Sequence, residues 1–175
     1  MRHASLRRLI LNALVLALAL ALPQAFHAVG LGSRFLPLLV PLLVNGFLSP
    51  LRWAALTGAL APVVSAVATG MPPLYPPVAL VVSAEGAVLG GVAALLYRAF
   101  GGRVWPALIA AVICGRGVAF LLSAWIAKPL GLPPVMAGAA LLAQGIPGVA
   151  LELAVTPLVV RAARSRGSLL LTDDD

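Results

Sequence analysis

The sequence contains few of the residues on which most enzymes depend. Among its 175 residues there are one cysteine, two histidines and five acidic residues, and only 10% are charged, whereas soluble domains are about one quarter charged. His3 lies in the amino-terminal tail and His27 in a predicted turn between helices, so they form neither a paired-histidine metal site nor part of a Ser-His-Asp triad. We therefore expect a protein that is not an enzyme and has no metal site and no cofactor.

Two further features are missing. Cys114 has no second cysteine with which to form an intrachain disulfide, so cysteine usage does not indicate a compartment. The chain also lacks a GxxxxGK[ST] phosphate-binding loop. If ATP drives its function, another chain must bind the nucleotide.

Apolar residues dominate the sequence instead. They make up 62% of the chain, and the mean hydropathy is +1.08. A soluble fold of this size could not bury so much apolar surface, so the sequence indicates an integral membrane protein surrounded by a lipid bilayer. The net charge of +7 would suggest nucleic acid in a soluble protein, but here the basic residues flank hydrophobic stretches. We expect no nucleic-acid partner.

Proline, glycine and arginine divide the apolar sequence into six candidate helices. These are expected near residues 8–26, 36–49, 51–69, 77–97, 104–127 and 134–161. The segment 36–49 is short for a hydrocarbon core of about 30 Å, so it is tilted, partly re-entrant or shielded by its neighbours. We predict an all-α integral membrane fold, a six-transmembrane-helix bundle that forms a single domain over residues 1–175, with 162–175 as a short cytoplasmic tail.

The distribution of basic residues predicts the orientation of the bundle. With six spans both termini lie on one side of the membrane, and most basic residues lie on that side: Arg2, Arg7, Arg8, Arg52, Arg98, Arg103, Arg161, Arg164 and Arg166. Only Arg34 and Lys128 fall on the opposite side. By the positive-inside rule, both termini are cytoplasmic. The first span can also be interpreted as a cleaved signal peptide, although its uninterrupted apolar length favours retention.

Three ionisable residues lie inside apolar stretches that otherwise exclude charge. They are Glu85, Arg116 and Glu152, each in a different predicted span. An ionised group near the bilayer centre costs roughly 2.5–3.5 kcal/mol, so such residues usually pair or line a polar cavity. Helix rise places Glu85, Arg116 and Gln144 at a similar depth, while Glu152 lies deeper and either pairs with Arg116 or faces the cytoplasmic side. A buried bridge that only fixes helix packing is the alternative to a ligand site.

Polar residues near the predicted outer face extend the candidate binding site. His27 and Arg34 lie in a glycine-containing external turn, and Tyr75 lies in a proline-rich one. Asn45, in the second predicted helix, adds hydrogen-bonding capacity inside the membrane. The turns could close over a site, or they could simply connect helices.

The first predicted span contains a stripe of small residues, Ala13, Ala17 and Ala21, at intervals of four. Small residues at this spacing lie on one helix face and allow another helix to approach closely in lipid. The stripe could bind a partner chain or pack within this one.

The sequence resembles a known family of membrane proteins. The run FLPLLVPLLVNGFLSP at 35–50 is followed by Gly58, Ala61-Pro62, Ser65 and the run TGMPP at 69–73, then by Glu85 and Gly115-Arg116. These residues are similar to those of the substrate-binding S components of energy-coupling factor (ECF) transporters, and the similarity covers roughly residues 10–160.

The resemblance implies a multi-pass subunit in the plasma membrane of a prokaryote. Such S components have six helices with both termini inside, and they bind a vitamin or related micronutrient near the outer face. A transmembrane coupling subunit and two ATPase subunits supply the energy. An alanine stripe on the first helix docks onto the coupling subunit, and this stripe corresponds to Ala13, Ala17 and Ala21. The ligand site corresponds to Glu85 and Arg116, together with Gln144 of the sixth span.

Two departures from the family pattern limit the choice of substrate. The cobalt and nickel branch has a histidine at position two on an external amino terminus, whereas this chain has Arg2 and His3 on the predicted inner side. Metal transport is therefore not expected. Leu38-Leu39 replaces the polar start of the second helix found in related sequences. Other functions stay open: a structural or assembly protein whose charges lock helices together, a stand-alone small-molecule carrier and, further behind, an intramembrane enzyme.

Overall fold

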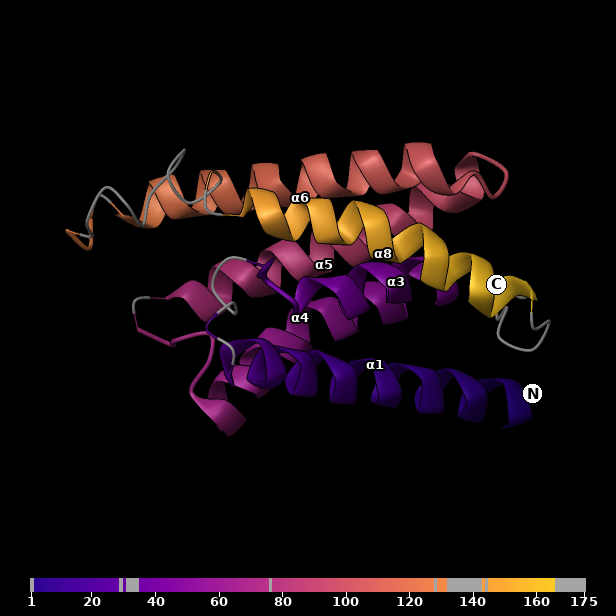
Figure 1. Ribbon diagram of the computed structural model, residues 1–175, viewed down its shortest axis with the longest axis horizontal. Helices are drawn as coiled ribbons and strands as arrows, with labels where there is room; N and C mark the ends of the chain where they lie inside the picture. Colours follow the sequence, from indigo (N-terminus) through magenta and orange to yellow (C-terminus); the bar gives the residue numbers. More distant parts are fainter. Residues whose placement is uncertain are drawn as a thin grey trace.

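The structure is entirely helical in the part of the chain that it describes. The computed structural model describes residues 2–28, 30, 35–75, 77–127, 129–131, 143 and 145–165. Within these ranges there is no strand, and six helices follow one another along the chain. They are α1 (Arg2–Ala28), α3 (Leu39–Leu48), α4 (Leu51–Thr69), α5 (Val78–Ala99), α6 (Val104–Ala127) and α8 (Ile146–Ser165), arranged as in Figure 1.

Five of the described helices are long and apolar enough to cross a membrane. The exception is α3, which has ten residues and is about 15 Å long at the rise of an α-helix. All ten of its residues are buried, so its neighbours shield it from the surroundings. It ends where Ser49 adopts an extended conformation before Pro50. The expectation that six helices span the bilayer stays a prediction.

The helix bounds differ from the expected ranges mainly at the chain ends. The observed α4 and α6 coincide with 51–69 and 104–127. Gly145 forms a turn and α8 begins at Ile146, while nearly all of the first part of the range 134–161 lies outside the described residues. At its other end α8 continues to Ser165, and there the Arg164 guanidinium carbon lies 4.6 Å from the centre of the Tyr97 ring on α5. This cation–π contact holds the last turn of α8 against α5.

Glycines allow α5 to lie very close to α3 and α4. A Cβ atom added to Gly86 on α5 would lie 2.6 Å from the carbonyl oxygen of Gly58 on α4. A Cβ atom on Gly46 of α3 would lie 2.6 Å from the carbonyl oxygen of Gly90, also on α5. No side chain fits at these positions without moving a backbone. Close approach of helices at small residues is a main source of association energy in lipid, so α5 forms the centre of the packed unit.

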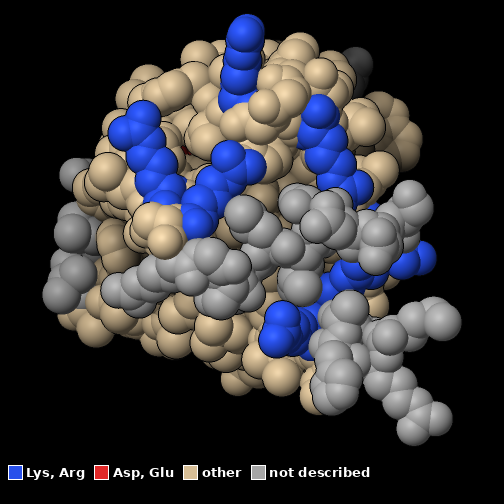
Figure 2. Space-filling model, turned by 90° about the vertical axis from the view of Figure 1, so that its right-hand side faces the viewer, with Lys and Arg blue, Asp and Glu red and all other residues tan. Residues whose placement is uncertain are grey.

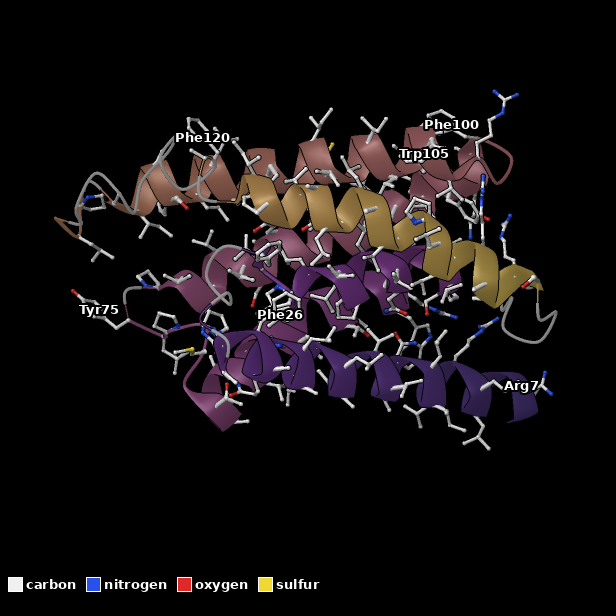
Figure 3. The ribbon with its side chains drawn as sticks, viewed as in Figure 1. Arg7, Phe26, Tyr75, Phe100, Trp105 and Phe120 are labelled. Carbon is white, nitrogen blue, oxygen red and sulfur yellow. The ribbon has the colours of Figure 1, made fainter. Side chains whose placement is uncertain are left out.

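The two ends of the bundle differ in charge. The first turn of α1 and the last turn of α8 lie at the same end, on the right of Figure 1. Figure 2 looks onto this end and shows basic side chains gathered there. The exposed arginines lie near the start of α1 (Arg7), at the start of α4 (Arg52), at the end of α5 (Arg98), between α5 and α6 (Arg103) and in α8 (Arg161). Tyr75 lies at the opposite end from Arg7 in Figure 3. This polarity agrees with the predicted topology, in which the arginine-rich end faces the cytoplasm.

Candidate functional site

Arg116 on α6 joins the two glutamates of the membrane-spanning helices. Its Nη1 lies 2.9 Å from Oε1 of Glu85 on α5, at ion-pair distance. Its Nη2 donates a hydrogen bond of 2.9 Å to Oε1 of Glu152 on α8. We call Glu85, Arg116 and Glu152 the charge cluster. The prediction that the buried charges face one another is confirmed, and of the two positions open to Glu152, the structure has the one beside Arg116.

Small residues and helix register bring the cluster together. Gly115, next to Arg116, packs so tightly on α5 that an added Cβ atom would lie 2.7 Å from Cγ of Leu89. Leu89 is one turn after Glu85, so this contact sets α6 at the height and distance at which the guanidinium reaches the carboxylate. The α8 side is also close-packed, because Gly148 lies one turn before Glu152 and an added Cβ atom there would lie 2.7 Å from the carbonyl oxygen of Phe35.

The charge cluster is almost fully removed from the surroundings. The exposed fraction of the side chain is 14% for Arg116, 4% for Glu85 and 0% for Glu152. Charges that are buried to this extent must be paired, because the loss of one partner leaves the other without compensation. Burying these charges is therefore costly, and the packing of α5, α6 and α8 around them depends on all three side chains.

Several polar atoms around the cluster have unused hydrogen-bonding capacity. Among the described residues, no hydrogen-bond partner is present for Oε2 of Glu152, Oγ1 of Thr156 or Nε of Arg116. Oε1 of Glu85 is close to Arg116 but does not meet hydrogen-bond geometry. Thr156 follows Glu152 by one turn and is also completely buried. Buried polar atoms are normally satisfied, so these atoms are candidates for contact with a ligand or with water.

Sequence reasoning did not identify Thr156. Its signal was the spacing of four residues from Glu152, which places both side chains on one face of α8. Gly148 lies on the same face one turn in the other direction. The three residues form a continuous buried strip, since all of them are buried in the structure.

The segment before α3 lies close to this strip. Phe35 contacts Gly148, and Leu36 has a φ of 45°, an unusual value for a residue with a side chain. The ring of Phe35 also lies 5.9 Å from that of Phe26 near the end of α1. The connection between α1 and α3 therefore reaches α8 one turn from Glu152, on the side of the cluster away from the arginine-rich end.

Two of the residues predicted to contribute to the site from the external turns, His27 and Tyr75, are described, and both are exposed. His27 is exposed at the end of α1. Tyr75 is 75% exposed and points away from the bundle, so the structure does not bring it to the charge cluster (Figure 3). Arg34 and Gln144 lie outside the described residues.

Asn45 belongs to a second buried polar group, which sequence reasoning did not connect. Asn45 Nδ2 and Thr57 Oγ1 both donate to Asn12 Oδ1, at 2.9 and 2.7 Å. Ser49 Oγ donates to Asn45 Oδ1 at 2.7 Å. We call Asn12, Asn45, Ser49 and Thr57 the asparagine network. It joins α1, α3 and α4 near the arginine-rich end, separate from the charge cluster, and its signal in the sequence was the isolated polar residue Asn12 in an apolar helix.

The alanine stripe does not pack within the described part of the chain. Ala13, Ala17 and Ala21 are all exposed, whereas Val15 and Ala19 on the other face of α1 are buried. The inner face of α1 thus contacts α3 and α4 through apolar residues and the asparagine network. The stripe is left as a flat, small-residue surface on the outside of the bundle.

The chain matches one family of known proteins. The family model described as ECF transporter, substrate-specific component, matches residues 7–160. This range includes the charge cluster, the asparagine network and the alanine stripe. No curated protein and no solved structure matches the chain.

Proposed function

The chain belongs to the family of ECF transporter substrate-specific components, and from this we propose that it captures a vitamin or related micronutrient for ATP-driven uptake. In this proposal it is a multi-pass protein in the plasma membrane of a prokaryote. All six helices lie in the bilayer and both termini are cytoplasmic. The gathering of exposed arginines at one end of the bundle supports this orientation.

The ligand binds at the charge cluster. Glu85 and Arg116 contact it directly, and Gln144 contributes from the sixth span. His27, Arg34 and Tyr75 belong to the outer turns and act on the approaching ligand rather than at the charge cluster. The observation that carries this proposal is the cluster itself, in which charges from three helices meet with buried polar atoms left unsatisfied. Polar groups inside a membrane protein are costly and typically mark ligand or ion sites.

The alanine stripe of α1 docks onto a transmembrane coupling subunit, which in turn binds two ATPase subunits. Its exposure supports this role, because a stripe that packed within the chain would be buried. Small residues along one face give a partner helix the close approach that stabilises association in lipid.

Coexpression with an ECF coupling subunit and ATPase subunits tests both parts of the proposal. The chain should copurify with these subunits, and mass spectrometry should detect one small molecule enriched in the preparation. Replacing Ala13 and Ala17 with leucine should abolish copurification and leave the retained molecule in place, because the stripe is remote from the cluster. Val67→Leu on α4, where Val67 is 74% exposed, is the matched control and should leave the complex intact.

A structural role for the charge cluster is the second candidate, because each carboxylate already has a cationic partner. In that case no small molecule would be retained, and a variant without the three charges would keep all other properties of the protein. A complex that survives substitution of the alanine stripe would contradict the docking role.

A further inference from the structure

The charge cluster has one more anionic group than cationic groups. Arg116 is its single guanidinium, and it contacts the carboxylates of both Glu85 and Glu152. The exposed arginines of the described residues lie at the arginine-rich end. On α8 the arginine nearest in sequence to Glu152 is Arg161, nine residues later. A helix rise of about 1.5 Å per residue separates the two by roughly 13 Å along the axis. With all groups ionised, the cluster has a formal charge of minus one.

An uncompensated charge in this position is unfavourable. Glu152 and Glu85 are almost entirely buried, and the low-dielectric interior increases the cost of an ion without a partner. Of the ion pairs within the described residues, those of Glu85 and Glu152 are both with Arg116, so a proton or a cation that enters the site balances the remaining charge. A ligand with a positive group gains this electrostatic energy on binding, whereas a carboxylate ligand would be the third anion around one guanidinium.

The unsatisfied atoms favour the same kind of ligand. Oε2 of Glu152 is an acceptor, and the hydroxyl of Thr156 can accept as well as donate. Both residues are completely buried. A cationic ligand with N–H groups on the charged nitrogen, or with an amino group near a quaternary ring, would donate hydrogen bonds to these oxygens, and charge-assisted hydrogen bonds are the stronger kind. Nε of Arg116 is an unused donor, so a neutral acceptor on the same ligand would complete the set.

We infer that the ligand carries a cationic nitrogen group, such as an ammonium, an amidinium or a protonated or quaternary heteroaromatic ring, which lies against Glu85 and Glu152. This inference rests on the proposed function, since it assigns a substrate class to the same site. It adds that micronutrients whose only charge is a carboxylate are poor ligands.

The test measures binding to the purified chain in lipid nanodiscs. Isothermal titration uses three probes of different charge: thiamine as a cation, riboflavin as a neutral molecule and pantothenate as an anion. Mass spectrometry identifies any molecule that the protein retains from the cells. The retained molecule should be a cation at neutral pH, and among the probes only the cation should bind or compete with it.

Charge-neutralising variants give a second readout. Glu152→Gln and Glu85→Gln each bring the cluster to formal neutrality while keeping side-chain size, and each should weaken binding of the cation by roughly tenfold or more. Arg103→Gln, which removes an exposed charge at the arginine-rich end, is the matched control and should bind the cation normally. If the glutamine variants do not fold, native mass spectrometry of the unmodified chain still identifies the retained molecule and therefore its charge.

The outcomes separate failure of the cationic assignment from failure of the proposed binding function. A neutral or anionic retained molecule, or unchanged cation affinity in well-folded Glu152→Gln and Glu85→Gln proteins, would overturn the cationic assignment and leave the transport function standing. If the chain retains no molecule and binds none of the probes, the proposed binding function fails and the cationic assignment fails with it.

Discussion

Arg116 makes the two glutamates dependent on each other, because one side chain neutralises both. Substituting only Glu85 and Arg116 would leave Glu152 buried without its hydrogen-bond donor. A test of structural against functional roles must therefore remove all three charges together. Single and triple variants then report different quantities, the cost of an unpaired charge and the need for the cluster itself.

We predict that Arg116→Met lowers stability by roughly 3–5 kcal/mol, because two buried carboxylates lose their common partner. The triple variant Glu85→Gln/Arg116→Met/Glu152→Gln should recover most of this loss and still fail to bind ligand. Thermal unfolding in detergent and equilibrium binding measure the two effects separately. Normal binding by the well-folded triple variant would assign the cluster a purely structural role.

The asparagine network should contribute to stability rather than to binding. Replacing Asn12 with leucine leaves Asn45 Nδ2 and Thr57 Oγ1 without their shared acceptor, and each unsatisfied buried group costs about 1–3 kcal/mol. We expect a lower unfolding temperature and unchanged ligand affinity. Asn45→Leu should behave in the same way. Should Asn45→Leu reduce affinity while stability is preserved, Asn45 would instead be a ligand residue, as the sequence alone suggested.

At the scale of helices, contact between backbones determines where α5 lies. The close approach of Gly86 to Gly58 and of Gly90 to Gly46 leaves no space for a Cβ atom. These contacts place Glu85, adjacent to Gly86, at a fixed height relative to α3 and α4. Packing of α5 and the position of the charge cluster are thus linked through neighbouring residues on one helix.

Gly86→Ala should therefore reduce both the folded yield and ligand binding. The added methyl group would lie 2.6 Å from a backbone oxygen, which cannot rotate away, and overpacking of this kind typically costs about 1–3 kcal/mol. Gly117→Ala on α6 is the matched control, since no atom lies within 4 Å of the added Cβ. Size-exclusion profiles and unfolding temperatures compare the two variants. Equal stability would show that α5 can shift to accommodate the methyl group.

The sequence predicted helices well where apolar length and boundary residues agreed. The bounds of α4 follow from Pro50 and from Gly70, which adopts the left-handed conformation at its end. It predicted which residues carry buried charge, because charge is costly in lipid. It gave the pairing of Glu152 with Arg116 as one of two positions but could not choose between them, since the choice depends on the rotation of α8 about its axis. The asparagine network likewise depends on the packing of three helices, which no local pattern encodes.

At the scale of the whole molecule, the arginines give the bundle a direction. Exposed arginines concentrate at the end that holds the first turn of α1 and the last turn of α8. Positive residues near short loops are retained on the cytoplasmic side. The outer turn that contains Tyr75 should then face the medium, together with the approach to the charge cluster.

Impermeant thiol labelling of intact cells checks this orientation. In a Cys114→Ser background, a cysteine at Leu74 should react from outside, because Leu74 is 55% exposed and directly precedes Tyr75, which lies at the end opposite Arg7. A cysteine at Ser165, the exposed last residue of α8, should react only after the cells are lysed. The reverse pattern would invert the bundle and place the proposed site on the cytoplasmic side.

The shielding of α3 has a consequence for its flanking backbone. Because every residue of α3 is buried in protein, its length does not have to match the thickness of the bilayer. The chain can therefore leave the helical conformation at Leu36, where φ is 45°, beside the third residue of α8, where a lipid-facing segment would have to keep all its peptide groups paired. At this break the carbonyl oxygen of Leu36 accepts a hydrogen bond from the backbone N–H of Leu39, so the chain enters α3 with a backbone partner and without a preceding turn of helix.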